Sequence, residues 1–253
     1  MKKKNSTAQQ KKVKFDNKHL NDPKIKKVYL TFKKQLYSQI KNEKFCIGVS
    51  GGPDSLALAF LCKIFSKEFN SKFIALIIDH NLRKQSATEA QKVKIILTKH
   101  KIRAKILTWK GKIPKSNIQF NARNIRYFLL KKECNKLNIK NLVLAHHESD
   151  LIENFFIRLF RGSGLKGLSS LNIKRHSENN ILNLIRPLIN TKKNELIYIS
   201  KKIFKFYFTD PSNFNEKFLR TKIRNYLDKF KLDGLDINKI KLTLSNLRSA
   251  NES

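Results

Sequence analysis

The 253-residue sequence contains only three cysteines, Cys46, Cys62 and Cys134, and no C-x-x-C pair. This scarcity argues against a disulfide scaffold, a zinc finger and a cysteine-bound iron–sulfur centre. The sequence also lacks any apolar run near the roughly 20 residues of a membrane-spanning helix. Residues 1–4 lead into polar sequence without the apolar core of a signal peptide. We therefore expect a protein of the reducing cytoplasm with no membrane partner.

Acidic residues are scarce as well, because 19 Asp and Glu stand against 54 Lys and Arg, a formal net charge of +35. Such a field attracts polyanions and releases their counterions. Nucleic acid is the first candidate partner, and an anionic membrane surface is the second. Part of the excess reflects codon bias, since the chain is also rich in Asn, Ile and Phe and has only 8 Gly. The remainder indicates an acidic partner.

The length allows one large domain or two small ones. A basic, disordered arm is predicted over residues 1–28, which are rich in lysine and poor in large apolar side chains. A catalytic domain is predicted over residues 29–225. The remaining residues, 226–253, are predicted to form a short helical tail.

Apolar runs alternate with helical patterns in the first 150 residues. Strands are predicted over 45–49, 73–78, 104–109 and 142–145. Helices are predicted over 28–40, 56–65, 89–100, 119–137, 151–161, 192–204, 218–230 and 237–247. A loop is expected over 165–180 and an extended segment over 182–189. This alternation predicts an α/β fold with a doubly wound parallel sheet, where ligands bind beyond the carboxyl ends of the strands.

The most informative segment, Ser50-Gly51-Gly52-Pro53-Asp54-Ser55, lies between the first predicted strand and a predicted helix. Adjacent glycines and a helix N-terminus present backbone N–H groups to a phosphate. Asp54 suits a Mg²⁺ ion that bridges carboxylate and phosphate oxygens. The segment is neither a Walker A loop nor a G-x-G-x-x-G turn. A tight turn with a serine cap is the alternative, and the full hexad favours the phosphate site.

Polar residues also follow the second and fourth predicted strands, as Asp79-His80 and His146-His147. These pairs and the glycine-rich segment are expected at one edge of the sheet, as in an active site. Arg123 and Arg126 are three residues apart, so they share a helix face that suits either a phosphate or solvent.

Asp150 and Glu153 follow the two histidines on one predicted helix face. His and Asp together could ligate a metal ion. Two carboxylates could equally orient the ammonium group of an amine nucleophile. Both alternatives stay open on the residues alone.

Three of the eight glycines fall in Arg161-Gly162-Ser163-Gly164-Leu165-Lys166-Gly167, where the backbone must bend or approach a ligand closely. Further polar motifs are Arg186-Pro187-Leu188, the turn-forming Asp210-Pro211-Ser212-Asn213, and the pair Arg220 and Arg224.

Seven motifs in order over residues 45–225 resemble the tRNA(Ile)-lysidine synthase family, whose members are ATP pyrophosphatases. They are S-G-G-x-D-S, D-H-x-L-R, Q-x-x-A-R-x-x-R-Y, H-H-x-x-D-x-x-E, R-G-S-G-x-x-G-L, R-P-L and D-x-S-N with its following arginines. The resemblance implies an enzyme that uses ATP and Mg²⁺ to attach free L-lysine to the wobble cytidine of an isoleucine tRNA with a CAU anticodon. ATP adenylates the cytosine 2-oxygen, and the product lysidine switches decoding from AUG to AUA.

The resemblance also implies roles for individual residues. The expected ATP-binding residues are Ser50 to Ser55, Asp79 and His80. The expected catalytic residues are Asp54, Arg123, Arg126, His146, His147, Asp150 and Glu153. Asp54 would lie near Mg²⁺, an arginine of the pair would neutralise the α-phosphate, and the last two acids would orient lysine. The expected tRNA contacts are Arg161, Arg186, Arg220 and Arg224.

The chain departs from the family pattern at two positions, where Asn154 and Thr221 replace the usual Thr and Asn. Longer members carry C-terminal domains that grip tRNA, and we expect these to be absent here. The basic arm or a homodimer is expected to compensate.

Three rival functions fit the sequence less well. A related tRNA cytidine or uridine thiolase needs catalytic or cluster-binding cysteines, for which no suitable pair exists. Small-molecule synthetases share the loop but leave the positive charge unexplained. A non-catalytic RNA-binding protein would not require the intact Asp54, His146, His147 and Asp150.

Overall fold

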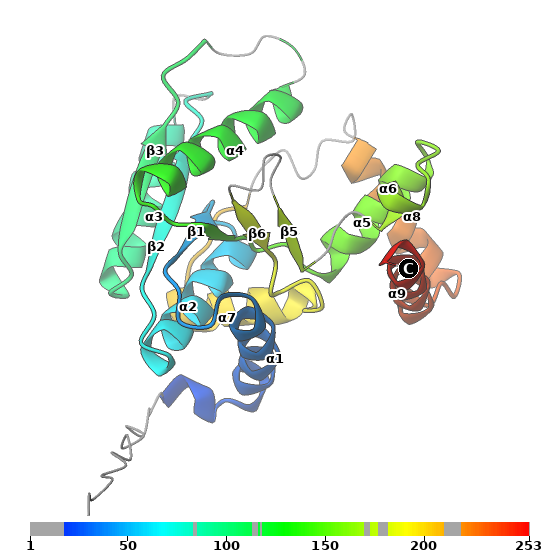
Figure 1. Ribbon diagram of the computed structural model, residues 1–253, viewed down its shortest axis with the longest axis horizontal. Helices are drawn as coiled ribbons and strands as arrows, with labels where there is room; N and C mark the ends of the chain where they lie inside the picture. Colours follow the sequence, from blue (N-terminus) through cyan, green and yellow to red (C-terminus); the bar gives the residue numbers. More distant parts are fainter. Residues whose placement is uncertain are drawn as a thin grey trace, which may run out of the picture.

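The computed structural model describes residues 18–82, 85–112, 116, 118–169, 173–176, 182–209 and 219–252. Its centre is a six-stranded sheet in the order β3-β2-β1-β4-β6-β5 (Figure 1). The strands are β1 (Phe45–Val49), β2 (Phe73–Asp79), β3 (Ala104–Thr108), β4 (Asn141–Val143), β5 (Lys174–His176) and β6 (Asn183–Ile185). The four predicted strands and β6 run parallel, and β5 pairs with β6 in the antiparallel sense at the edge.

Helices cover both faces of the sheet, which confirms the doubly wound α/β fold. One face packs on α1 (Pro23–Ile40), α2 (Pro53–Glu68), α3 (Ser86–Lys99) and α7 (Lys193–Phe204), and the other on α4 (Ile118–Lys136). Strand β1 shows why this works, because Phe45, Ile47 and Val49 enter the first core while Cys46 enters the second. Successive side chains of a strand point to opposite faces, so an apolar run serves both layers.

A helical lobe stands beside the sheet, at the right of Figure 1. It consists of α5 (Glu148–Leu159), α6 (Leu165–Leu168), α8 (Leu219–Leu232) and α9 (Ile237–Glu252). Its own buried core joins Leu151 and Phe155 of α5 to Leu227 of α8 and Leu244 of α9. The boundary predicted at residue 225 therefore falls inside a helix, and residues 226–252 pack as part of this lobe.

The first helix begins earlier than predicted. Asp22 caps α1 by accepting hydrogen bonds from the backbone of Lys24 and Ile25, and Pro23 occupies the first turn. Ile25 is fully buried, because helical spacing brings it onto the same face as Phe32. A short 3₁₀ turn, η1 (Lys18–Asn21), precedes the cap. The predicted disordered arm is therefore wrong for residues 18–28, and residues 1–17 lie outside the described part of the chain.

Other expectations need correction or fall outside the described residues. The loop predicted over 165–180 contains α6 and β5. The extended segment predicted over 182–189 is β6 followed by a turn. Arg83 and residues 210–213 lie outside the described part of the chain. None of the described helices is both long and apolar enough to span a membrane.

Candidate active site

Residues 50–55, called the phosphate loop from here on, connect β1 to α2. Gly51 adopts φ +86°, and a Cβ there would lie 2.5 Å from Val93 Cγ2 and 3.0 Å from a Phe208 ring carbon. Only glycine fits this combination of left-handed backbone and close packing. Gly52 caps α2 without a side-chain hydrogen bond, and Pro53 starts the helix. The unpaired N–H groups of the first turn are therefore available to an anion.

The loop holds itself in shape through Ser55. Its Oγ accepts from the backbone N–H of Ser50 at 3.2 Å and donates to the carbonyl of Gly52 at 3.0 Å. Ser50 Oγ lies 3.3 Å from Ser55 Oγ. The hydroxyl of Ser55 thus organises the loop, whereas Ser50 is exposed and open to a ligand.

Phe208 is a contributor that the sequence analysis missed. Its backbone N–H donates to the Gly51 carbonyl at 2.9 Å, and its ring packs against the same glycine. The segment after α7 therefore supports the phosphate loop from a distance of more than 150 residues in sequence. The run of aromatic residues directly before the D-P-S-N turn was the available signal.

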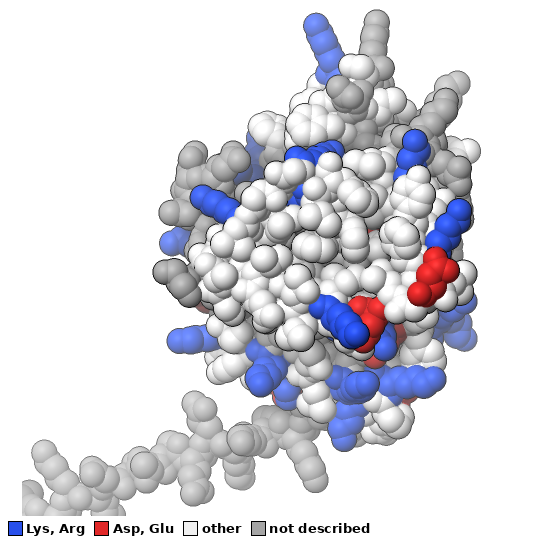
Figure 2. All heavy atoms as spheres, turned by 90° about the vertical axis from the view of Figure 1, so that its right-hand side faces the viewer, with Lys and Arg blue, Asp and Glu red and all other residues white. Residues whose placement is uncertain are grey.

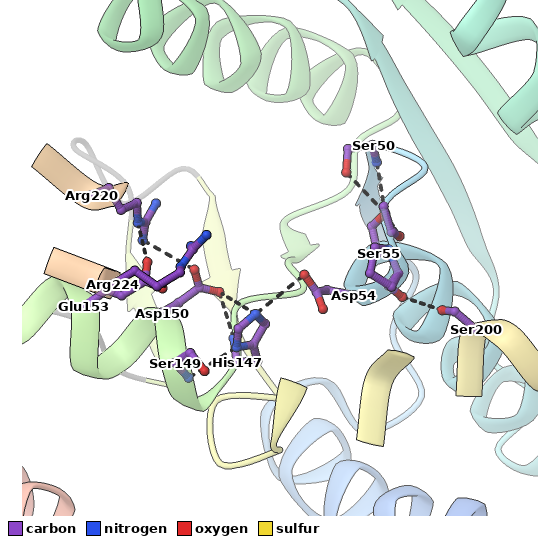
Figure 3. Close-up of polar contacts among 12 residues, drawn as sticks. Ser50, Asp54, Ser55, His147, Ser149, Asp150, Glu153, Ser200, Arg220 and Arg224 are labelled. Atoms are coloured by element: carbon purple, nitrogen blue, oxygen red, sulfur yellow. Dashed lines mark hydrogen bonds and ion pairs between the residues drawn. The ribbon is translucent and has the colours of Figure 1, made fainter. Parts of the chain in front are cut away.

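His147 links the phosphate loop to α5, as Figure 3 shows. Its Nε2 lies 3.5 Å from Asp54 Oδ2 and 3.6 Å from Asp150 Oδ2. Its Nδ1 accepts from the backbone N–H of Ser149 at 3.2 Å, so the ring proton is on Nε2 and faces both carboxylates. Asp150 in turn accepts from the backbone N–H of His147, which completes a capping box. Two expected catalytic acids are thus joined by one imidazole.

The charge environment explains how these groups titrate. Burial lowers the pKa of His147, but Asp54 and Asp150 outweigh it, and the net pKa is raised. Burial raises the pKa of Asp150, yet His147, His146 and Arg220 bring it down to about 2. Asp150 is therefore ionised at neutral pH, next to a histidine that holds its proton more tightly than usual.

Asp150, Glu153, Arg220 and Arg224 form a second group, the carboxylate–arginine cluster (Figure 3). Glu153 is only 2% exposed. Its Oε2 accepts from Arg220 Nε and its Oε1 from Arg224 Nε, both at 2.8 Å. Arg220 Nη2 also lies 3.4 Å from Asp150 Oδ1. The two arginines predicted to contact tRNA therefore already have carboxylate partners inside the chain.

His146, the residue before His147, pairs with Arg186. Arg186 Nε donates to His146 Nδ1 at 3.2 Å, and Arg186 is only 2% exposed. The expected tRNA contact of Arg186 stays a prediction, and the structure shows its guanidinium buried against His146. Burial, reinforced by nearby arginines, lowers the pKa of His146 to about 3, so its ring is neutral. Arg161, by contrast, is exposed in the turn that follows α5.

The remaining predicted residues surround the same edge of the sheet. Asp79 is buried, and its Oδ1 accepts from the backbone N–H of Asn81 and the hydroxyl of Ser86, so it shapes the loop after β2. Burial, with a smaller effect of Arg126, lowers the pKa of His80 to about 4. Arg123 acts on His146 in the same sense. The two arginines of α4 thus lie near the two neutral histidines, as convergence at this edge requires.

The site fits an anionic ligand and a hard cation. Asp54 Oδ1 is buried and has no hydrogen-bond partner among the described residues. No cluster of three or more His, Cys, Asp or Glu in the described ranges could hold a metal ion by itself. Mg²⁺ needs no such cluster, since it commonly binds one or two carboxylates together with substrate phosphates. Asp54 could supply that carboxylate beside the phosphate loop.

The fold and the loop define an ATP-binding domain of the α/β class, and comparison with known proteins agrees. A family model described as the PP-loop domain matches residues 25–230. The chain belongs to the PP-loop family.

Two curated relatives are called tRNA(Ile)-lysidine synthase. The protein of Orientia tsutsugamushi is 44% identical over 188 residues, which cover 74% of this chain and 42% of the relative. That of Rickettsia bellii is 41% identical over 187 residues, which cover 74% of this chain and 43% of the relative. The matched stretch is thus less than half the length of each relative.

A solved structure has the same fold. It is the U34-tRNA thiolase NcsA of Methanococcus maripaludis with its [4Fe-4S] cluster, at a TM-score of 0.75 and 19% identity over 88% of this chain and 78% of that one. At this identity the likeness concerns the fold.

Proposed function

We propose that the chain catalyses the reaction of a tRNA(Ile)-lysidine synthase, in which ATP activates the wobble cytidine of an isoleucine tRNA and lysine attacks it. The observation that carries the proposal is the His147 bridge between the phosphate loop and the carboxylates of α5. Through this single side chain, the loop that would activate the nucleotide lies next to the carboxylates that would bind the amine. The names of the relatives in Orientia and Rickettsia support the same reaction.

The chemistry divides between the two groups. The cytosine 2-oxygen attacks the α-phosphorus of ATP, the bond to the β-phosphate oxygen breaks, and pyrophosphate leaves. The ε-ammonium group of lysine gives one proton to solvent water. The resulting neutral amine forms a C–N bond to C2 and gives a second proton to water, while the C2–O bond breaks and AMP leaves. The phosphate loop would bind the pyrophosphate, and Asp54 would hold Mg²⁺, which offsets phosphate charge.

The geometry favours Asp150 over Glu153 as the direct partner of the lysine ammonium group. Both oxygens of Glu153 already accept from arginines, whereas among the described residues Asp150 Oδ1 has a single, longer contact of 3.4 Å with Arg220. Asp150 is also held ionised, because its pKa is lowered to about 2: burial raises it, but the neighbouring histidines and Arg220 outweigh that effect. Glu153 would then act by positioning Arg220.

The positions of the three cysteines argue against the alternative that the chain is a tRNA thiolase. All three are buried, and Cys46 and Cys134 lie on the α4 face of the sheet. The pKa of Cys46 is raised by its hydrogen bond with Cys134 and by burial, and that of Cys62 is raised by burial. Buried, protonated thiols neither ligate a cluster nor attack a substrate.

The test is mass spectrometry of nucleosides from an isoleucine tRNA transcript incubated with the protein, ATP and lysine. We expect a lysine-bearing cytidine that requires all three, together with one AMP per modified nucleoside. Omission of lysine is the control. A sulfur-bearing nucleoside, or AMP release without a lysine adduct, would refute the proposal.

A further inference from the structure

Helix α8 carries an exposed stripe of one leucine and two aromatic side chains on the side that does not touch Glu153. Tyr226 is 51% exposed and Phe230 is 45% exposed, and Leu219 lies in line with them. Spacings of seven and four residues place all three side chains on one helix face. We call Leu219, Tyr226 and Phe230 the α8 stripe. Large exposed aromatic rings in a row mark a binding surface.

The orientation of the stripe is fixed by what the rest of the helix does. Ile223 and Leu227 are buried in the core of the helical lobe, and Arg220 and Arg224 reach Glu153. The stripe therefore lies outside the buried seam of the same helix that enters the candidate active site. One helix thus serves both the site and the surface next to it.

Basic residues flank the stripe. Lys222 and Lys229 are exposed and lie seven residues apart, on the side of α8 next to Tyr226. Figure 2 shows the side of the molecule on which the helical lobe lies, where Lys and Arg side chains surround a broad uncharged area and few acidic ones appear. The two lysines beside the stripe therefore favour an anionic partner over an uncharged or positively charged one.

We propose that the α8 stripe binds unpaired nucleotides of the RNA substrate, with bases stacked on Tyr226 and Phe230 and phosphates paired with Lys222 and Lys229. The inference rests on the proposed function, because a base can enter the site only from an RNA segment whose bases are unstacked. Rings one helical turn apart, about 6 Å, match the spacing of successive nucleotides in an extended strand. Stacking on aromatic rings combined with a basic groove is how proteins hold single strands.

The test compares affinity for two RNAs, a hairpin with an unpaired loop and a fully paired duplex of equal length. Replacing both rings (Tyr226→Ala with Phe230→Ala) is expected to weaken hairpin binding about tenfold or more per ring. Duplex binding should change less than about twofold, because a duplex offers no free base faces. Leu242→Ala on α9, where the side chain is 62% exposed, is the matched control and should leave both affinities unchanged.

Two further measurements separate the roles of rings and charges. In Phe230→Trp, a base that stacks on the new indole should quench its fluorescence with the hairpin and not with the duplex. Lys222→Gln and Lys229→Gln should each lower the salt dependence of hairpin binding by about 0.7 in the log–log slope. Tyr226→Phe should retain full affinity, since it keeps the ring.

The failures of the two proposals are distinguishable because binding needs no turnover. If the wild-type protein makes the lysine adduct and the double variant binds the hairpin equally well, the stripe is not an RNA surface. If the double variant instead converts a dimer to a monomer in sedimentation without changing RNA affinity, the stripe is an interface between copies. If the wild type makes no adduct, the proposed function fails, and the hairpin comparison still decides the surface.

Discussion

The phosphate loop and the carboxylate–arginine cluster face each other across His147, yet they are built in opposite ways. The loop is six consecutive residues whose shape depends on local hydrogen bonds and on one glycine. The cluster joins residues 67 and 71 positions apart, from α5 and α8. A loop of the first kind is fixed by short-range geometry. A cluster of the second kind exists only once two helices have packed.

The two regions also differ in how their charges are balanced. Asp54 Oδ1 lacks a hydrogen-bond partner among the described residues, whereas each oxygen of the buried Glu153 carboxylate accepts from an arginine. An incompletely paired acid is suited to a cation that arrives with a ligand. A fully paired acid is suited to holding other groups in place.

The strongest expected effect comes from Asp54→Asn, which removes the charge that the phosphate loop offers to a metal-bound nucleotide. Turnover should fall by ~100-fold or more, the loss expected when stabilisation of transferring charge is removed. Affinity for tRNA should stay nearly unchanged, because the residue lies in the nucleotide site. Single-turnover kinetics and filter binding measure the two. Full turnover by this variant would show that the metal binds elsewhere and that Asp54 and Glu153 do not differ in the way proposed.

Gly51 occupies a position where only glycine fits, whereas Gly164 occupies a position with open space around it. Gly51→Ala forces a side chain into Val93 at a positive φ, so the free energy of unfolding should fall by about 2–4 kcal/mol. ATP affinity should fall with it. Gly164→Ala is the control, because a Cβ there meets nothing within 4 Å, and stability should change by no more than about 0.5 kcal/mol. Urea unfolding decides, and equal losses would contradict the packing argument.

Glu153→Ala tests whether the cluster serves the amine. Arg220 would lose its main partner, compete for Asp150 and repel an incoming ammonium group, so the KM for lysine should rise about tenfold. The KM for ATP should change less than twofold. Glu148→Ala, on the same helix and paired with Lys241 of α9, is the matched control and should leave the KM for lysine unchanged. A larger change for ATP than for lysine would move the cluster's role to the nucleotide.

The adjacent residues His146 and His147 should change the free energy of unfolding in opposite directions as the pH changes. The pKa of His146 is lowered to about 3 by burial, so the unfolded chain binds the extra proton below pH 6.5 and stability falls as pH drops from there. The slope is about 1.4 kcal/mol per pH unit. His147 has a raised pKa: burial lowers it, but Asp54 and Asp150 outweigh this, so its contribution is present below pH 6.5 and is lost as pH rises through the folded value.

Urea unfolding between pH 4.5 and 8 measures these slopes in the variants His146→Gln and His147→Gln. The first change should flatten the acid side of the profile, and the second should flatten the alkaline side. The same flattening in both variants would show that the two rings share one environment, contrary to the structure.

The smallest effect is expected from deletion of residues 2–17, which carry six lysines. If they bind tRNA, the salt dependence of binding should flatten, because each neutralised phosphate releases counterion. The cut stops before η1, since Leu20 packs against the main core. ATP and lysine affinities should not change. If the salt dependence does not change, tRNA binding would be attributed to the helical lobe, including the α8 stripe.

The sequence predicted the sheet edge well, and the reason is physical. Strand β1 matched its predicted limits, and the polar pairs after β2 and β4 do converge on the phosphate loop. Alternating strands and helices leave little choice of topology, and the carboxyl ends of parallel strands share one edge. The α6 turn and β5 were missed because four- and three-residue elements carry too little periodicity.

The roles of single arginines could not be predicted. Arg186 lies in an apolar segment and Arg220 in a basic one, yet both were expected to contact tRNA. Packing buries the first against His146 and draws the second to Glu153. A guanidinium can pair with RNA, an imidazole or a carboxylate, and only the final positions of the helices select among these partners.

By itself the sequence determined the α/β fold, the phosphate loop between β1 and α2, and the sheet edge at which the candidate site lies, because these depend on periodicity, on glycine geometry and on strand order. The tertiary structure decided which charges meet. It placed His147 between Asp54 and Asp150, closed two arginines onto Glu153, and supported Gly51 with Phe208. Those contacts join residues distant in the chain, and their energies depend on burial and distance, which no local pattern records.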